Sequence, residues 1–92
     1  MTQQQLIKIT KALADPTRFQ ILQAIAGAGE TCCGDLARRF PITQATVSQH
    51  LKILGEAGLI EVRREGQFNF CRMSRDVLDD YRHALGASFD KA

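Results

Sequence analysis

Three cysteines carry the most distinctive chemistry in this 92-residue chain. Cys32 and Cys33 are adjacent, and Cys71 lies far downstream. Neighbouring Cα atoms are about 3.8 Å apart, whereas disulfide partners are about 4.4–6.8 Å apart, so the adjacent pair is poorly placed to form a disulfide. The two thiols can instead ligate one soft ion together. Both precede a predicted helix N-terminus, which favours thiolates, and an odd number of cysteines argues against a secreted disulfide framework.

The polar face of a helix predicted over residues 43–58 is the second group with evident chemistry. Thr43 suits its N-cap. Val47, Leu51 and Leu54 fall within about 60° of one another around the axis and form a narrow apolar stripe. The opposite surface carries amides and hydroxyls rather than Glu–Lys pairs. Amides bond to adenine edges and hydroxyls to phosphates in the major groove, so this surface is suited to DNA, with an ordinary solvated helix as the alternative.

The distribution of charge favours a nucleic-acid partner. The whole chain has a net charge of +2 and a pI of about 8.6. Residues 36–75 carry seven basic and three acidic groups, a net charge of +4, whereas residues 1–35 are neutral and residues 76–92 carry −2. Positive charge is therefore centred on the polar-faced helix and the segment after it, as contacts with phosphates require. A solvated surface with uneven charge is the alternative.

The elements that position these groups follow from apolar periodicity and turn signals. The pattern predicts, in chain order, helices over 3–14 and 16–26, an extended segment at 30–33, a helix over 34–40, the polar-faced helix, strands over 59–65 and 68–73, and a helix after Ser74. Two helices joined by about three residues and followed by a basic hairpin form a winged helix-turn-helix. We therefore expect a mainly α fold with a small antiparallel β hairpin, in one domain over residues 1–92.

Several classes of function are disfavoured by what the sequence lacks. No apolar run approaches ~18 residues, so no transmembrane helix and no membrane partner are expected. Residues 1–5 lack the features of a signal peptide, which favours a cytoplasmic protein. The chain has only two histidines, no Ser/His/Asp spacing and no Gly-rich phosphate loop, so we expect neither an enzyme nor a required cofactor. A winged helix that binds protein instead of DNA is an alternative.

Residues 12–22, 35–37 and 46–60 form a specific combination, in which Ser-x-His-Leu is followed by Leu-x-x-Ala-Gly-Leu. In these segments the chain resembles the ArsR/SmtB family of bacterial winged-helix repressors. The resemblance implies a homodimer that binds double-stranded operator DNA, with a palindromic operator, and releases it when an inducer binds. It also implies dimerisation through the first and last helices, whose apolar residues include Leu6, Ile9, Leu13, Leu78, Tyr81 and Leu85.

The same resemblance assigns the DNA contacts. Ser48 and His50 fall at DNA-contacting positions, and base sequence would be recognised at Gln44, Thr46 and Gln49. Basic side chains are expected to position the protein on phosphates. These are Lys52, Arg38, Arg63 and Arg64.

The resemblance also indicates two places for a sensing site. One common site uses acidic and His ligands on the last helix. Here that helix has Asp79, Asp80 and His83 but no second histidine after them, so we do not expect a zinc-type site there.

The other common site, in arsenic sensors, places Cys-x-Cys-Asp-Leu at the start of the third helix. This chain has Cys32-Cys33-Gly34-Asp35-Leu36 there, so the match is partial. In winged helices the strand before the third helix pairs with the second hairpin strand, which would bring Cys71 close. We therefore predict that Cys32, Cys33 and Cys71 bind arsenite, antimonite or a soft metal ion. A thiol redox switch and inert buried cysteines are the alternatives.

Overall fold

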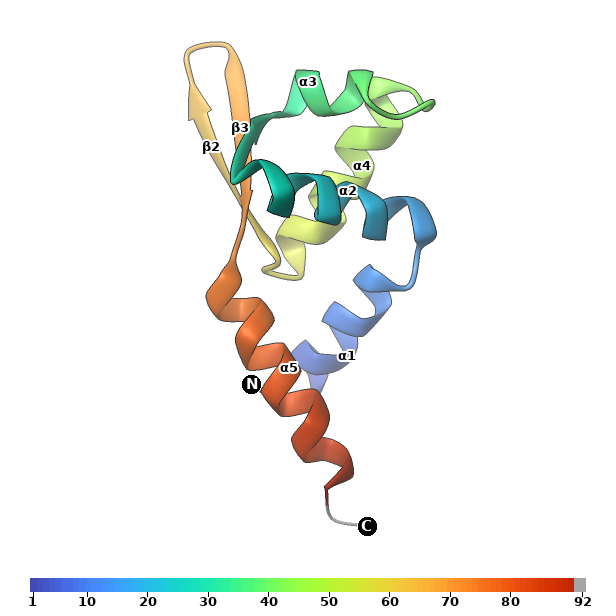
Figure 1. Cartoon of the computed structure of the whole chain (residues 1–92), viewed down its shortest axis with the longest axis vertical. Coiled ribbons are helices and arrows are strands. Elements are labelled where there is room, and N and C mark those ends of the chain that lie inside the picture. Colours follow the sequence, from blue (N-terminus) through green and yellow to red (C-terminus); the bar gives the residue numbers. More distant parts are fainter. Residues whose placement is uncertain (91–92) are drawn as a thin grey trace.

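The computed structural model describes residues 1–90 and confirms the predicted winged helix-turn-helix (Figure 1). Within residues 1–90 the elements follow one another as α1 (Gln3–Leu13), α2 (Pro16–Ala28), β1 (Glu30–Cys32), α3 (Cys33–Arg38), α4 (Gln44–Glu56), β2 (Ile60–Glu65), β3 (Phe68–Met73) and α5 (Arg75–Phe89). The short segment β1 pairs with the hairpin, so the sheet has three antiparallel strands in the order β1-β3-β2. No helix within residues 1–90 is long and apolar enough to span a bilayer.

Local capping residues explain where the helices start. The side chain of Asp15 accepts a hydrogen bond from the backbone N–H of Arg18, and Pro16 occupies the first helical position of α2. Thr43 caps α4 in the same way through the N–H of Thr46. The end of α2 was predicted two residues too early. The helix continues to Ala28 and stops at Gly29, whose positive φ of +77° breaks the helix and is readily adopted by glycine.

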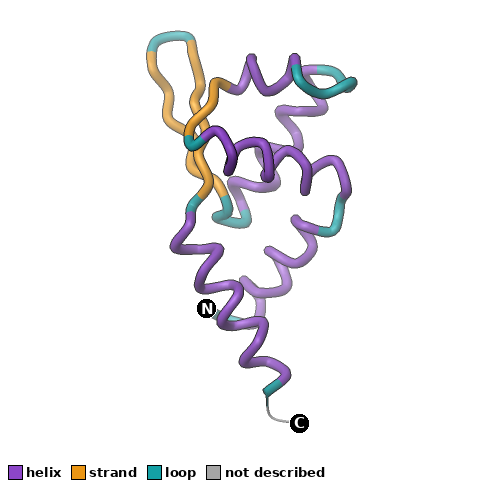
Figure 2. Tube along the Cα trace, in the orientation of Figure 1, coloured by secondary structure: helices purple, strands orange, loops and turns teal. Residues whose placement is uncertain are grey.

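The apolar faces of the helices meet in one core. Figure 1 shows α2, α3 and α4 stacked against the sheet, while α1 and α5 lie together at the opposite end of the molecule. Figure 2 shows how short the loops between these elements are, which leaves α3 and α4 as a closely packed pair. The side chains excluded from water include Ile21, Ile25, Leu36, Val47, Leu54 and Leu59.

Strand pairing assigns each sheet residue to one of two faces. Thr31 and Val62 both pair with Cys71, and Cys32 and Arg63 both pair with Phe70. Directly paired residues point to the same face and successive residues alternate. The inner face, which packs on the helices at Ile60 and Cys71, therefore carries Thr31, Ile60, Val62, Arg64, Asn69, Cys71 and Met73. The outer face carries Glu30, Cys32, Glu61, Arg63, Glu65, Phe68, Phe70 and Arg72.

Candidate nucleic-acid interface and thiol pair

Helix α4 is anchored by its apolar stripe and presents its polar face to solvent. Val47, Leu51 and Leu54 are buried against the core, as the periodicity predicted. The amides, hydroxyls and lysine expected to contact DNA are exposed; they are Gln44, Thr46, Ser48, Gln49 and Lys52. The hydroxyl of Thr46 lies 2.9 Å from that of Thr43, the residue that caps the helix. The arrangement therefore leaves two turns of hydrogen-bonding groups free to enter a major groove.

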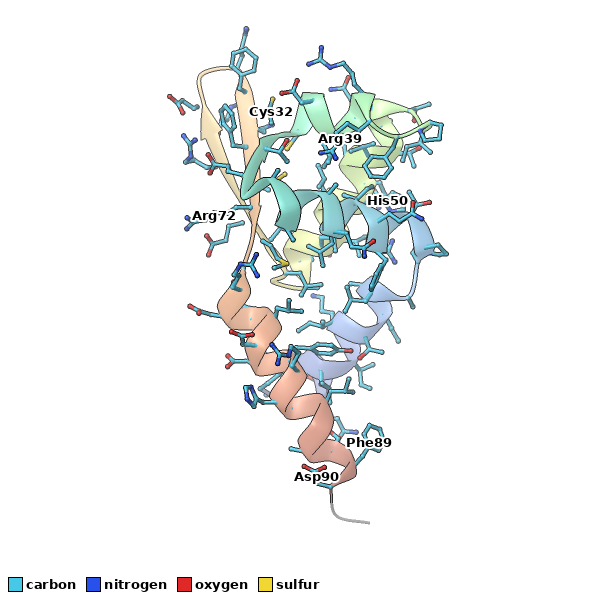
Figure 3. All side chains as sticks on the ribbon, viewed as in Figure 1. Cys32, Arg39, His50, Arg72, Phe89 and Asp90 are labelled. Carbon is cyan, nitrogen blue, oxygen red and sulfur yellow. The ribbon has the colours of Figure 1, made fainter. Side chains whose placement is uncertain are left out.

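His50 differs from the other predicted DNA contacts because it has a partner inside the protein. It is half-buried where α4 crosses α2 (Figure 3). Its Nδ1 lies 3.2 Å from Nη1 of Arg18. Sequence reasoning missed Arg18 altogether. The two residues are 32 positions apart, and no local pattern links them.

The two adjacent arginines of the wing have different environments. Arg63, on the outer face, forms ion pairs with Glu65 and with Glu30, 2.9 Å away, and its guanidinium lies 4.9 Å from the centre of the Phe70 ring. Hydrogen bonds to the two carboxylates, Glu30 first, raise the pKa of Arg63 above its usual range. Arg64 lies on the inner face and donates only to the carbonyl of Gly66, at 3.4 Å, among residues 1–90. Of the two predicted phosphate contacts in the wing, Arg63 thus has carboxylate partners inside the protein, whereas Arg64 has none within residues 1–90.

The remaining predicted phosphate contacts also differ in whether a carboxylate of the protein pairs with them. Arg38 is exposed but forms an ion pair with Asp35 of the same helix. Lys52 has no carboxylate partner among the residues that the structure describes. Arg39, which sequence reasoning did not select, is exposed next to Arg38 and likewise has no such partner in that part of the chain. Among the basic residues of α3, α4 and the hairpin, Lys52, Arg64 and Arg39 thus lack a carboxylate partner within residues 1–90.

The sheet brings together two of the three cysteines. Cys33 and Cys71 have neighbouring thiols, and the fully buried thiol of Cys71 also lies 3.6 Å from the carbonyl of Thr31. Cys32 pairs with Phe70 on the outer face, whereas its neighbour Thr31 pairs with Cys71. Within residues 1–90 no three His, Cys, Asp or Glu side chains are grouped to hold a metal ion, the last helix included. The structure therefore replaces the predicted trio with a pair.

Burial disfavours the thiolate form of both Cys33 and Cys71. Burial is the largest effect on both thiols: it raises the pKa of Cys33 and raises the pKa of Cys71 to about 12. The neighbouring Cys33 thiol adds to the shift at Cys71. The expectation that a helix N-terminus would favour thiolates is thus wrong for Cys33, because a six-residue helix offsets little of the cost of burying a charge.

A groove between α4 and the wing connects the thiol pair to the candidate DNA surface. It is lined by Cys33, by Ser48, Lys52 and Glu56 on α4, and by Val62 and Asn69 on the inner face of the wing. Its volume is about 430 Å³, enough for a small ligand. We call it the inner groove.

The residues expected at a dimer interface fall into two groups. Ile9 is 1% exposed, and Leu6 and Tyr81 are nearly as buried, so these three mainly stabilise the single chain. Tyr81 of α5 also shares a 2.9 Å hydrogen bond with the hydroxyl of Thr10 in α1. Leu13 and Leu78 are half-buried against the core, and Leu85 remains exposed. Apolar side chains that the prediction left out are exposed at the same two helices: Met1 just before α1, Ile7 in α1, and Phe89 at the end of α5.

Comparison with known proteins places the chain among transcriptional regulators. A family model described as a helix-turn-helix domain matches residues 13–63. The transcriptional repressor SdpR of Bacillus subtilis is 40% identical over 72 residues, which cover 78% of this chain and 79% of SdpR. The arsenical resistance operon repressor of Staphylococcus aureus is 34% identical over 80 residues, which cover 87% of this chain and 76% of that protein.

A solved structure agrees with these matches. It is the solution NMR structure of the homodimeric winged helix-turn-helix DNA-binding domain of a possible ArsR-family transcriptional regulator from Mycobacterium bovis. It is 30% identical and superposes with a TM-score of 0.76, covering 96% of this chain and 82% of that one. The exposed face of α4, the wing and these similarities lead to one conclusion: the chain belongs to the ArsR family of winged-helix transcriptional repressors.

Proposed function

We propose that the chain is a homodimeric repressor that binds a palindromic operator and releases it when a thiophilic inducer binds Cys33 and Cys71. The observation that carries this proposal is the inner groove, which is lined both by a thiol and by the DNA-facing side chains Ser48 and Lys52. A ligand held at Cys33 would lie between α4 and the wing. It lowers operator affinity because it binds the DNA-free conformation more tightly than the DNA-bound one.

In the DNA complex, the exposed face of α4 would enter the major groove. Gln44, Thr46 and Gln49 would contact base edges, and Ser48 would contact a phosphate. Lys52 and Arg64 would contact phosphates on either side of the inner groove, since neither has a carboxylate partner within residues 1–90. The two half-sites would lie about 34 Å apart or a multiple of it. A cytoplasmic location follows from a chromosomal DNA partner.

The dimer would form on α1 and α5. Ile7, Leu85 and Phe89 border one cleft between the two helices, and Phe89 is 75% exposed. A second copy would cover these side chains. Light scattering of Phe89→Glu should give the mass of a monomer, while Phe68→Glu, an equally drastic change at an exposed phenylalanine of the wing, should leave the dimer intact. A dimeric Phe89→Glu would exclude this interface.

The protonated state of the thiol pair favours one class of inducer. Oxyacids of trivalent arsenic and antimony condense with two thiols and release water, so no net proton leaves. A divalent soft cation must instead displace both protons, which is costly when burial raises the pKa of both thiols. The chain supplies one thiol in the lining of the groove, Cys33, and a second, Cys71, buried beside it, and burial keeps both neutral until an inducer arrives. We therefore favour arsenite or antimonite over cadmium, and we propose no cofactor for DNA binding itself.

An operator-release titration tests the proposal. A duplex selected from a random library by the wild-type chain is bound, then titrated with arsenite, antimonite, cadmium or hydrogen peroxide. Arsenite and antimonite should release the DNA with little dependence on pH between 6 and 8. Cadmium affinity should rise by about 100-fold per pH unit, because two protons leave. Release by none of the four, with the thiols shown to be free, would contradict the sensor.

A redox sensor is the second candidate, and the contact between Cys33 and Cys71 also favours it. A hydroperoxide would oxidise the Cys33 thiol to a sulfenic acid and leave as water or alcohol. Cys71 would then attack that sulfur, expelling a second water and forming a disulfide. Thiols with raised pKa values react slowly with peroxide, which is why this candidate is second. Mass spectrometry after peroxide treatment distinguishes the two, since a disulfide loses two hydrogens and adds no atom.

A further inference from the structure

The guanidinium of Arg18 contacts α1 and α4 from the start of α2. The Nε of Arg18, in the first turn of α2, donates to the carbonyl of Ala12 at 2.6 Å, and its Nη2 donates to the carbonyl of Lys11 at 3.4 Å. Its Nη1 lies 3.2 Å from Nδ1 of His50 in α4. Arg18 is thus the meeting point of the end of α1, the start of α2 and the middle of α4.

The local sequence explains why Arg18 can make these contacts. Asp15 caps α2 and accepts the backbone N–H of Arg18 at 2.9 Å, which fixes the first turn. Both carbonyls that Arg18 contacts belong to the last turn of α1, where carbonyls carry partial negative charge, and that of Lys11 also accepts from the backbone N–H of Ala14 at 3.2 Å. A cation is therefore stabilised at this junction, and the same cap holds its side chain toward α4.

The chemistry of the two side chains determines which nitrogen of His50 is protonated. A guanidinium only donates hydrogen bonds, so Nδ1 of His50 must accept. A neutral imidazole that accepts at Nδ1 carries its proton on Nε2. The Arg18 contact thus selects one tautomer, fixes the plane of the ring, and holds the turn of α4 that also carries Ser48 and Gln49.

We propose that Arg18 is a positioning residue for operator binding, which sets the orientation of α4 through Nδ1 of His50 and links it to α1. Arg18 itself contacts no base in this proposal. The inference rests on DNA binding through the exposed face of α4. Because α1 also carries part of the proposed dimer surface, the same contact transmits the geometry of the dimer to the DNA-binding helix.

Substitutions that replace one or the other ring nitrogen of His50 with an amide test the proposal. His50→Asn places an amide oxygen near the position of Nδ1, whereas His50→Gln places an amide near the position of Nε2. The probe is a duplex selected from a random library by the wild-type chain, without any thiophile. His50→Asn should keep most of the affinity. Arg18→Gln and His50→Gln should each lose about 10-fold, and the double variant Arg18→Gln/His50→Gln should lose no more than either, a coupling within the range known for linked sites.

Two further measurements separate positioning from a general loss of structure. Arg82→Gln removes an exposed arginine of α5 that pairs only with Asp79 within residues 1–90, and should leave affinity unchanged. Where Arg18→Gln lowers the folded fraction, Arg18→Lys replaces it, since one ammonium keeps a donor for α1 but cannot hold His50 as well. Nitrogen-15 NMR of the DNA-free protein should show His50 unprotonated at Nδ1 and protonated at Nε2, and this pattern should be lost in Arg18→Gln.

Three outcomes would overturn the proposal. The first is a double variant whose loss equals the product of the single losses. The second is wild-type affinity in His50→Gln together with loss in His50→Asn, which would assign His50 to a direct DNA contact through Nε2. The third is a proton on Nδ1 in the wild-type chain. If the wild-type chain selects no sequence from the library, DNA binding fails instead, and the NMR spectrum still decides the Arg18–His50 contact.

Discussion

The two faces of the small sheet differ more than their sequences suggest. The outer face carries Arg63 between Glu30 and Glu65, with Phe70 beneath the guanidinium. Arg72 and Glu61 form a further ion pair there, at 2.9 Å, and Arg72 projects away from the helices (Figure 3). Most charges on this face are matched within the protein.

The inner face has the opposite character. It carries the buried thiol of Cys71 and, beyond the core, Val62, Arg64 and Asn69 facing the inner groove or the solvent beside it. Within residues 1–90, Arg64 has no carboxylate partner. The charges of the outer face are thus paired within the wing, whereas Arg64 on the inner face is not. Sequence neighbours such as Arg63 and Arg64 therefore have different environments.

The largest expected difference between the faces concerns the thiols. Cys33→Ser and Cys71→Ser should each raise the arsenite concentration needed for DNA release by more than about 100-fold, beyond the loss usual for a merely supporting group. Cys32→Ser, on the outer face, should respond like the wild type. Gel-shift titration measures all three, and a hydroxyl at position 71 can still donate to Thr31 and preserve the fold. An equal loss in Cys32→Ser would restore the three-thiol site.

The inner thiol should also make stability depend on pH. The pKa of Cys71 is about 12 in the folded chain, against 9.0 for a free thiol. Below pH 9 the thiol is protonated in both states and contributes no pH dependence. Above pH 9 the Cys71 thiol ionises in the unfolded chain but not in the folded one. The free energy of unfolding therefore falls by about 1.4 kcal/mol per pH unit until the pKa of the folded state is reached.

Urea unfolding between pH 8 and 10.5 measures this decline. Cys71→Ser should flatten the curve relative to the wild type, because the hydroxyl does not ionise there. Cys32→Ser serves as the matched control from the outer face and should leave the slope largely unchanged. A Cys71→Ser curve that parallels the wild type would show that the thiol is not buried in solution.

The two arginines of the wing should differ in their effect on DNA binding. Arg64→Gln removes one phosphate contact per subunit, so the slope of log affinity against log salt should become shallower by about 2 for a dimer. Arg63→Gln should leave the slope unchanged and lower only the stability of the wing. Fluorescence anisotropy at several salt concentrations measures both. A larger change for Arg63→Gln would assign the outer face to DNA.

The smallest expected effect is at the exposed Arg72–Glu61 pair. Glu61→Gln should lower the free energy of unfolding by no more than about 1 kcal/mol, because exposed ion pairs contribute little. It should change neither operator affinity nor the arsenite response. Denaturant unfolding and the gel-shift titration provide these readouts, and an altered arsenite response would connect the outer face to the sensor.

Much of this molecule was predictable from local sequence. The cap at Thr43, the apolar stripe of α4 and the two strands of the hairpin depend on signals within a few residues, and the structure confirms each of them. The exposure of the polar side chains of α4 followed from the same stripe. These features depend on side chains three or four positions apart, so a single sequence contains enough to infer them.

The arrangement of the reactive groups required the tertiary structure. Whether Cys32 or Cys33 faces Cys71, and whether Arg63 or Arg64 meets Glu30, depends on the register between strands that are about 40 residues apart in the chain. A shift of one residue would exchange every one of these assignments. The sequence by itself thus determined the winged helix and its DNA-facing helix, because caps and periodicity are local. Only packing decided which thiols pair, which arginine is free and which partner holds His50, because those contacts join elements that have no local interaction.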